Sequence, residues 1–575
     1  MNVSSLINVL WPELVLVIAA CILFLIGAVT RLSARRLAPI IATAVLVGLF
    51  FSLWYHGAGA DGQGTQATST DSQKTLIVGG FAYYIKMITA GLGILFALLA
   101  WPTNHQATGN SALDFANDGG EFFGLMLLSL AGVFLVAGAN DIMLLFLGIE
   151  LASIPTYIMV SISRPLPIAQ EAGVKYFFLG AMAAALMLFG FSYLYGTTGQ
   201  TKLDNIAQAI TITAGGAGSL STWQLLAVVM LLLGFAFKIA AVPLHTYAGD
   251  VYQGAATPVT AFLAFVPKAS GFIAIIKILS VVLLALPQVP DVLFNLLWVL
   301  AILTMIFGNA LAVTSQYNIK RVLAYSSVAH SGYMLAALTA MLAARGIVDP
   351  SNPGHGMQVA DLALMGVLFY LCAYGIMNTG AFGVLMMLPS RTDANARLAA
   401  NGQPLPTAGS AETFDDIAGQ GRQYPALGLA MMICCLSLTG IPLTIGFLGK
   451  VLIVKPIWAA TANAHYSSML WWLVVILVIN AAVSAGYYLK IVAYMYLRTD
   501  VPETDFNPRR QPGRMYASVP VSIAIVLSVV GTLFYGIYIP GADALSRRAG
   551  QAASIFPHAG AEMTSQVQVS NRSGQ

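Results

Sequence analysis

Long apolar segments recur along the whole chain and constrain its fold more than any other feature. A helix needs about 20 apolar residues to cross the hydrocarbon core of a bilayer. Fourteen such segments can be recognised, at approximately 6–29, 37–55, 80–101, 121–139, 141–162, 172–195, 223–247, 257–286, 291–315, 320–343, 362–389, 425–454, 467–497 and 515–539. The chain is therefore predicted to be an all-α integral membrane protein with about 14 transmembrane helices.

The low charge content excludes an ordinary soluble protein. Only 9% of the residues are charged and 58% are hydrophobic, whereas soluble domains carry about 25% charged residues. So few charges cannot cover a water-facing surface, and most of the surface is expected to contact the lipid bilayer. The net charge of +4 is spread along the chain and forms no basic patch, so nucleic acid is not a predicted partner.

The four cysteines, Cys21, Cys372, Cys434 and Cys435, all lie in apolar segments. Their spacing is not that of a metal, haem or iron–sulfur site. We interpret them as small core residues. No metal ligand and no cofactor-binding residue is predicted, so this chain alone is expected to perform no redox chemistry.

The polarity of the first segment and of the loops predicts the orientation. Glu13 lies inside the first segment, and Arg31, Arg35 and Arg36 follow it, which is the reverse of a cleaved signal peptide. With fourteen spans, thirteen Lys and Arg residues of the loops fall on one side and four on the other, the C-terminal tail aside. Because the richer side is cytoplasmic, both termini are expected on the external side.

Four charged residues lie near the middle of predicted spans, where a charge costs roughly 2.5–3.5 kcal/mol on insertion scales. They are Glu150, Lys238, Lys268 and Lys450. Pro243 follows Lys238 and Pro442 precedes Lys450, so the seventh and twelfth spans are expected to be interrupted. A structural ion pair, such as Glu150 with Lys238, is one interpretation. Four charges at similar depth, two of them beside helix breaks, favour a proton pathway instead.

Two further residues are weaker relay candidates. Lys175 lies with Glu171 at the start of a span, where a long side chain can also reach the membrane surface. His330 lies about ten residues into its span and is either a relay or a hydrogen-bonded structural residue. The tyrosines near the end of the thirteenth span are interpreted as helix packing and an interfacial belt; they are Tyr487, Tyr488, Tyr494 and Tyr496. The polar stretches 197–221 and 391–422 are predicted to be loops.

Five stretches occur here in a combination that is specific to one family. They are LLFLGIELASIPTYIMV, EAGVKYFFLGAMAAALMLFG, GFAFKIAAVPLHTYAGDVYQGAATPVTAFLAFVPKASGF, NIKRVLAYSSVAHSGYM and LSLTGIPLTIGFLGK. Through them the chain resembles the proton-translocating subunits of respiratory complex I (NADH–quinone oxidoreductase), which are related to Mrp-type cation/proton antiporters. The stretch DVYQGAATPVTAF followed by Lys268, together with Lys450, looks like the antiporter-like N subunits in particular.

The resemblance implies a domain organisation. Residues 1–120 would form helices 1–3 with their loops, and residues 121–286 a first five-helix repeat of helices 4–8. Residues 287–497 would form a second, inverted repeat of helices 9–13 with the inserted loop 391–422. Residues 498–575 would hold the last helix and a polar tail. Helices 7 and 12 would be the broken helices of the two repeats.

The resemblance also implies a function, namely proton pumping coupled to electron transfer in a peripheral arm. Glu150 and Lys238 would form one half-channel, Lys268 and His330 would connect across the centre, and Lys450 would meet the opposite side. FMN, iron–sulfur clusters, NADH and quinone would bind partner subunits. The partners would include the antiporter-like M subunit and the K and J subunits, in a bacterial inner membrane. A subunit of an Mrp-type antiporter or of a membrane-bound hydrogenase is the alternative.

Overall fold

The computed structural model describes most of the chain as helices. The described residues are 3–28, 37–59, 76, 79–101, 119–164, 166–214, 219–286, 288–347, 354–389, 411–498 and 518–553. Within these ranges the only extended pairing consists of isolated bridges, Leu76 with Ala139, Asp141 with Lys202 and Asn318 with Thr413. The predicted all-α membrane fold is confirmed.

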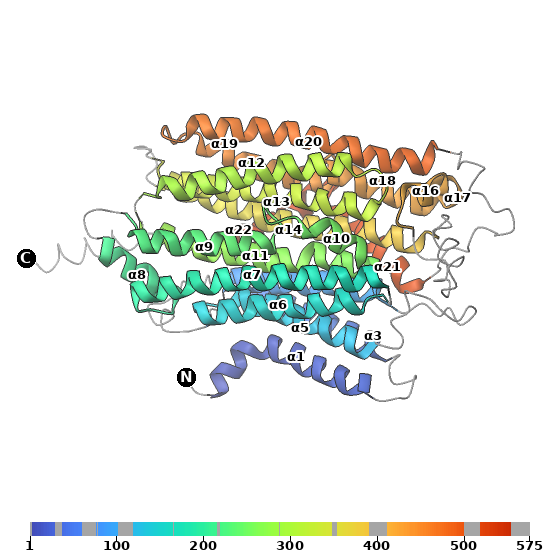
Figure 1. Cartoon of the computed structure of the whole chain (residues 1–575), viewed down its shortest axis with the longest axis horizontal. Helices are drawn as coiled ribbons and strands as arrows, with labels where there is room; N and C mark the ends of the chain where they lie inside the picture. Colours follow the sequence, from blue (N-terminus) through green and yellow to red (C-terminus); the bar gives the residue numbers. More distant parts are fainter. Residues whose placement is uncertain are drawn as a thin grey trace, which may run out of the picture.

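The helices run roughly parallel to one another and form one elongated bundle (Figure 1). The N-terminal helices are α1 (Val3–Ala28), α3 (Ala38–Gly59) and α4 (Gly80–Leu99). The next group is α5 (Gly119–Gly138), α6 (Ile142–Ile162), α7 (Pro167–Thr198), α8 (Leu203–Ala214), α9 (Thr222–Lys238), α10 (Tyr247–Gly254) and α11 (Thr257–Ala285). The third group is α12 (Asp291–Thr314), α13 (Ile319–Ala344), α14 (His355–Met387), α16 (Phe414–Ile417), α17 (Gln420–Gln423), α18 (Pro425–Thr439), α19 (Ile445–Ala460) and α20 (Ser467–Tyr496). Helices α21 (Val519–Ile537) and α22 (Ile539–Ala553) follow.

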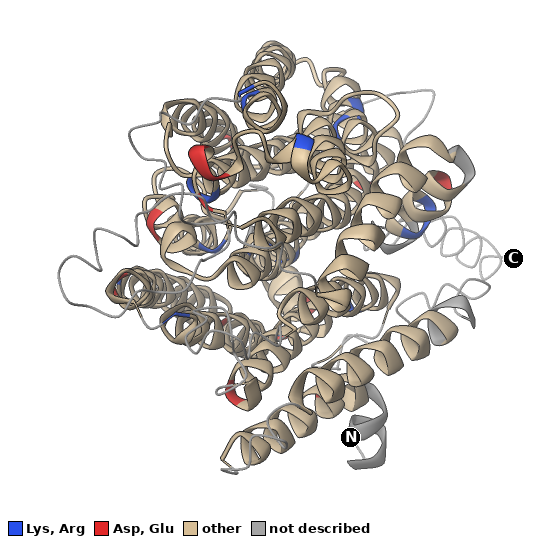
Figure 2. Cartoon of the chain, turned by 90° about the vertical axis from the view of Figure 1, so that its right-hand side faces the viewer, with Lys and Arg blue, Asp and Glu red and all other residues tan. Residues whose placement is uncertain are grey.

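Twelve of the described helices are long and apolar enough to cross a membrane. Two shorter apolar helices, α9 and α18, begin the segments predicted as spans seven and twelve. The count of fourteen spans stays a prediction, because each of these two segments is divided by a break. Viewed along the bundle in Figure 2, most of the ribbon is uncharged, and a few charged positions lie among the helices.

The two predicted helix breaks are present. The chain leaves helical geometry between α9 and α10 and again between α18 and α19. Each break holds a non-glycine residue in the left-handed region, Ala240 at φ 56° and Leu443 at φ 71°, a conformation that such residues rarely adopt. In Figure 1 the chain passes from left to right through α9 and α10, and from right to left through α18 and α19. The broken helices therefore run in opposite directions.

Two helices form where polar segments were predicted. Helix α8 lies in the stretch 197–221 that was predicted as a loop, and that prediction is wrong for residues 203–214. Its apolar residues follow the helical period and are buried: Leu203, Ile206, Ala207 and Ile210. Helix α22 lies in the predicted polar tail and packs against α4 and α14. Both helices are amphipathic, and a search for continuous apolar runs misses such segments.

The end of the predicted loop 391–422 is also structured. Residues 390–410 lie outside the described part of the chain. From Ala411 onward the segment forms α16 and α17, and Phe414, Asp416 and Gln420 are buried. The prediction of a solvated loop is therefore wrong for this C-terminal portion.

Candidate functional site

Lys238 is the last residue of α9, and its side chain is buried at the helix break. Its Nζ atom donates hydrogen bonds to Glu150 Oε1 at 2.9 Å, to Ser153 Oγ at 2.9 Å and to Tyr157 Oη at 3.2 Å. All three partners belong to α6. Ser153 can accept this bond because its own hydroxyl donates to the carbonyl of Ile149. The predicted pairing of Glu150 with Lys238 is thus present, with two neutral hydroxyls completing the ammonium's shell.

Lys268 lies in the middle of α11, a helix that is buried along nearly its whole length. Its Nζ donates to the carbonyl oxygen of Ser327 on α13 and lies 5.3 Å from the ring centre of Tyr374. Lys238 and Lys268 line one small cavity, together with Tyr252 of α10. The two predicted lysines thus reach the same small cavity.

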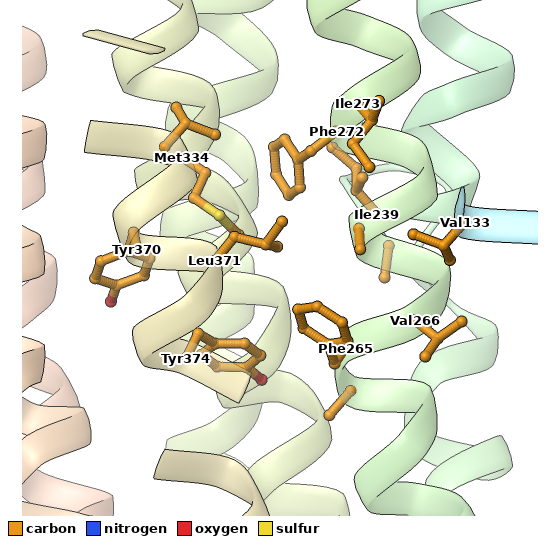
Figure 3. Close-up of a cluster of buried hydrophobic side chains, with 14 of the residues drawn as sticks. Val133, Ile239, Phe265, Val266, Phe272, Ile273, Met334, Tyr370, Leu371 and Tyr374 are labelled. Atoms are coloured by element: carbon orange, nitrogen blue, oxygen red, sulfur yellow. The ribbon is translucent and has the colours of Figure 1, made fainter. Parts of the chain in front are cut away.

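His330 of α13 is held between two phenols. Its Nδ1 atom lies 2.5 Å from Tyr370 Oη, and its Nε2 atom lies 3.0 Å from Tyr488 Oη. The rings of Tyr333 and Tyr374 also pack on the imidazole, with centres 5.5 and 5.0 Å away. Figure 3 shows Tyr370 and Tyr374 on one helix, with Tyr374 pointing toward Phe265 and Tyr370 pointing away from it.

Lys450 of α19 reaches back to the end of the preceding half-helix. Its Nζ donates to the carbonyl oxygens of Leu438 at 3.1 Å and Thr439 at 2.6 Å, which belong to the last turn of α18. Carbonyls in the last turn of a helix lack intrahelical partners and carry a partial negative charge. The break between α18 and α19 therefore supplies the ligands for this buried cation. Lys450 also lies 5.2 Å from the ring centre of Tyr333.

Lys175 is not part of this buried set. Its side chain is 43% exposed at the start of α7 and pairs with Glu171 at 2.7 Å and with Asp250 at 3.0 Å. Asp250 in turn pairs with Arg321 at 2.6 Å. The structure thus places Lys175 in a partly exposed ion network with Glu171, Asp250 and Arg321.

A second ionic cluster, which the sequence analysis did not identify, joins three segments at one end of the bundle. Glu412 pairs with Arg164, and it also pairs with Lys320 at 3.0 Å. The Lys320 side chain is fully buried and also donates to the carbonyl oxygen of Ala255 at 2.8 Å. Burial alone would raise the pKa of Glu412, but Lys320 and Arg164 outweigh it and hold the pKa below its ordinary value.

Tyr488 is one of the tyrosines near the end of the thirteenth predicted span that were interpreted as helix packing and an interfacial belt. Tyr488 is fully buried, which agrees with helix packing and not with an interfacial belt, and its hydroxyl also bonds His330 and Ser326. The sequence alone does not show which face of α20 is buried, so the role of Tyr488 could be identified only from the packing of the helices.

The described residues hold no group of three or more His, Cys, Asp or Glu side chains that could bind a metal ion. Cys372, Cys434 and Cys435 are buried, Cys21 is exposed, and all four are free thiols. The polar groups gathered here are lysines, a carboxylate, an imidazole and hydroxyls. Such groups can accept and release protons or bind a small cation.

Comparison with known proteins gives one consistent family. The chain matches the family described as NADH:quinone oxidoreductase/Mrp antiporter, TM, over residues 139–348 and 355–484. It is 34% identical to the NADH-quinone oxidoreductase subunit N of Trichlorobacter lovleyi, over 92% of this chain and 94% of that protein. A chain of respiratory complex I from Thermus thermophilus superposes with a TM-score of 0.65 at 26% identity, covering 92% of this chain and 97% of that one. A chain of the Mrp complex from Dietzia sp. has the same fold, with a TM-score of 0.67 at 20% identity over 94% of this chain and 97% of that one.

Proposed function

The chain belongs to the NADH:quinone oxidoreductase/Mrp antiporter membrane family, and from this premise we propose that its buried charged residues carry protons across the membrane. The chain is a subunit N of an NADH-quinone oxidoreductase, a translocase complex. The fold match to Mrp complexes, at 20% identity, reflects a shared architecture. The proposal concerns which residues form the pathway and how they act.

One observation supports the pathway above all others. Lys238 ends a broken helix at mid-bundle and meets Glu150 at 2.9 Å, with only 1% of the lysine side chain exposed. Broken helices at membrane depth are typical of transporter sites, where half-helix ends bind the transported ion. A lysine in such a place can lose its proton when the neighbouring carboxylate moves or is neutralised. The pair therefore acts as an electrostatic switch.

Lys268, His330 and Lys450 extend this pathway from one broken helix to the other. The cavity shared with Lys238 leads to Lys268, and the tyrosine-lined region around His330 lies between Lys268 and Lys450. Lys450 ends the series at the second broken helix. The two breaks thus lie at the two ends of one series of polar residues that crosses the bundle. Lys175 is outside this series and belongs to the partly exposed ion network.

The family also indicates the setting of the chain. FMN, iron–sulfur clusters, NADH and quinone are assigned to partner subunits, and this chain transmits the coupling through conformation and charge. The partners would be the M, K and J membrane subunits of the same complex. The surplus of Lys and Arg on one side of the spans supports external termini in a bacterial inner membrane.

The substitution Lys238→Arg tests the proposal. A structural ion pair needs only a positive charge, and arginine supplies it. A relay must release its proton, and arginine does not do so at ordinary pH because its pKa stays above about 12. We expect both the Lys238→Arg and the Lys238→Ala complex to assemble and to take up fewer protons per NADH oxidised in sealed membrane vesicles.

Lys175→Arg is the matched control, because the same exchange is made in a lysine of the partly exposed ion network. It should leave the ratio of protons to NADH unchanged. Unmodified pumping by an assembled Lys238→Arg complex would exclude Lys238 as a proton carrier.

A further inference from the structure

His330 has a hydrogen-bond partner at each ring nitrogen, and both partners are phenols. A neutral imidazole carries one N–H donor and one acceptor nitrogen, and an imidazolium carries two N–H donors. A phenol can donate or accept. Tyr370 and Tyr488 can therefore satisfy His330 in both protonation states. In the neutral state one phenol accepts and the other donates, and in the cationic state both accept.

The change between these states requires no movement of the ring. The imidazole is only 1% exposed, and the rings of Tyr333 and Tyr374 pack on it and restrict its rotation. Only the phenolic O–H that donates to the imidazole must turn when a proton arrives. Tyr488 is fixed further because its hydroxyl also bonds that of Ser326. This arrangement lets protonation change without repacking the core, which is densely filled and resists rearrangement.

Among the described residues, no carboxylate is found in contact with His330. The groups that face His330 are Lys268 of α11, Lys450 of α19, Tyr333 of α13, Tyr370 and Tyr374 of α14, and Tyr488 of α20. Both charged neighbours in this set are cations. A protonated His330 is therefore stabilised by hydrogen-bond acceptors, and Tyr370 and Tyr488 provide both of them.

We propose that Tyr370 and Tyr488 are positioning residues that make His330 a stopping point for the proton between Lys268 and Lys450. The inference rests on the proposed function and adds two residues to it. Each transfer runs through the phenol hydroxyl that occupies the ring nitrogen. One phenol gives its proton to the imidazole as it takes up the proton that the ammonium group of one lysine releases. The imidazolium then gives its other N–H proton to the second phenol, whose own proton passes on toward the second lysine. The two N–H bonds of the imidazolium form and break at opposite sides of the ring.

The experiment compares phenol-to-phenyl changes at four tyrosines that all touch His330. Tyr370→Phe and Tyr488→Phe each remove a hydroxyl that bonds the imidazole. Tyr333→Phe and Tyr374→Phe keep the same ring contacts and remove hydroxyls that do not bond it. Proton uptake per NADH oxidised is measured in sealed vesicles of assembled complex across a range of pH.

Tyr370→Phe and Tyr488→Phe are expected to lower the ratio, because the imidazolium loses an acceptor. The alkaline limb of the pH profile should move to lower pH by about one to two units. The loss of one hydrogen bond destabilises the imidazolium relative to the neutral imidazole by about this amount. Tyr333→Phe and Tyr374→Phe should leave the alkaline limb at its unmodified pH, whatever their effect on the ratio itself, because the imidazolium keeps both of its acceptors. The two active phenols lie on different helices, so a folding defect in one variant leaves the other as the test.

His330→Gln and Lys238→Arg separate the inference from the proposed function. If His330→Gln lowers the ratio while Tyr370→Phe and Tyr488→Phe match the two control variants, the inference is wrong and the pathway stands. If His330→Gln pumps normally, His330 is not a stopping point and the inference also fails. Normal pumping by Lys238→Arg would instead overturn the proposed function.

Discussion

At the scale of single residues, the three lysines of the proposed pathway differ in what surrounds them. Lys238 meets a carboxylate and two hydroxyls. Lys268 meets a backbone carbonyl and an aromatic ring, and Lys450 meets two helix-end carbonyls. An ion pair that only stabilises the fold would explain Lys238 and leave the other two unexplained, because each costs energy at membrane depth. A pathway with one switchable pair explains all three.

The carboxylate of Glu150 gives the first prediction at this scale. Glu150→Gln removes the negative charge with almost no change in shape, while Ser153 and Tyr157 still bond Lys238. We expect normal assembly and a reduced number of protons taken up per NADH, because the switch has lost its charge. Glu171→Gln neutralises a 63% exposed carboxylate that also pairs with a lysine, and it should pump normally. Equal pumping by the two variants would contradict the role of Glu150.

The sequence predicts these charges better than it predicts their surroundings. A Glu or Lys in an apolar segment is rare and costly, so its position alone indicates a protein interior. A tyrosine in the same segment fits the core, the interfacial belt and a polar site equally well. Tyr488 could be assigned only after the packing of α20 against α13 was known. The coupling of Glu412 to Arg164, 248 residues away in the chain, is likewise invisible in a local pattern.

At the scale of elements, the two broken helices serve their lysines differently. Helix α9 ends at Lys238 itself, so the side chain begins at the break. Helix α18 ends before Lys450, and the lysine turns back to its free carbonyls. Such breaks can be predicted from a sequence because proline and glycine disfavour a continuous helix. The amphipathic helices α8 and α22 are harder to predict from the sequence, because their polar faces interrupt the apolar runs.

Gly440 lies in the second break, next to Lys450, and gives a prediction for this break. It follows α18 at φ 89°, and a Cβ atom added there would lie 2.9 Å from Lys450 Cδ. A side chain in the left-handed region costs roughly 1–2 kcal/mol, and the contact would push Lys450 from its carbonyl ligands. Gly440→Ala is therefore expected to lower the number of protons pumped per NADH.

Gly486→Ala is the control for this prediction. Gly486 lies within α20, and a Cβ atom added there would meet no neighbouring atom within 4 Å. This variant should assemble and pump like the unmodified complex. If Gly440→Ala also pumps normally, the position of Lys450 at the end of α18 is not required for transport.

At the scale of the whole molecule, one ionic cluster joins the helices that carry the pathway. Arg164 follows α6, which bears Glu150, and Lys320 begins α13, which bears His330. Lys320 also bonds Ala255, between α10 and α11, and α11 bears Lys268. Glu412 pairs with both cations from the segment before α16. The carboxylate of Glu412 thus links the ends of α6 and α13, and Lys320 links them to the start of α11.

This cluster is expected to stabilise the folded chain as well. Glu412→Gln leaves Arg164 and the fully buried Lys320 without their shared counter-charge. Removing one partner of a buried ion pair costs on the order of 3 kcal/mol. We therefore expect a lower midpoint of thermal unfolding for the full chain in mild detergent at pH 7. Asp415→Asn removes an exposed carboxylate three positions further on and should leave the midpoint unchanged.

The pH dependence gives the same prediction a second test. Because the folded chain holds the pKa of Glu412 below its ordinary value of 4.5, the carboxylate's stabilisation is complete above that value and is lost as the pH falls through the lowered pKa. The difference in midpoint between the unmodified chain and Glu412→Gln should therefore shrink as the pH falls below about 4.5. A Glu412→Gln chain that unfolds at the unmodified midpoint at pH 7 would show that the cluster does not hold these helix ends together.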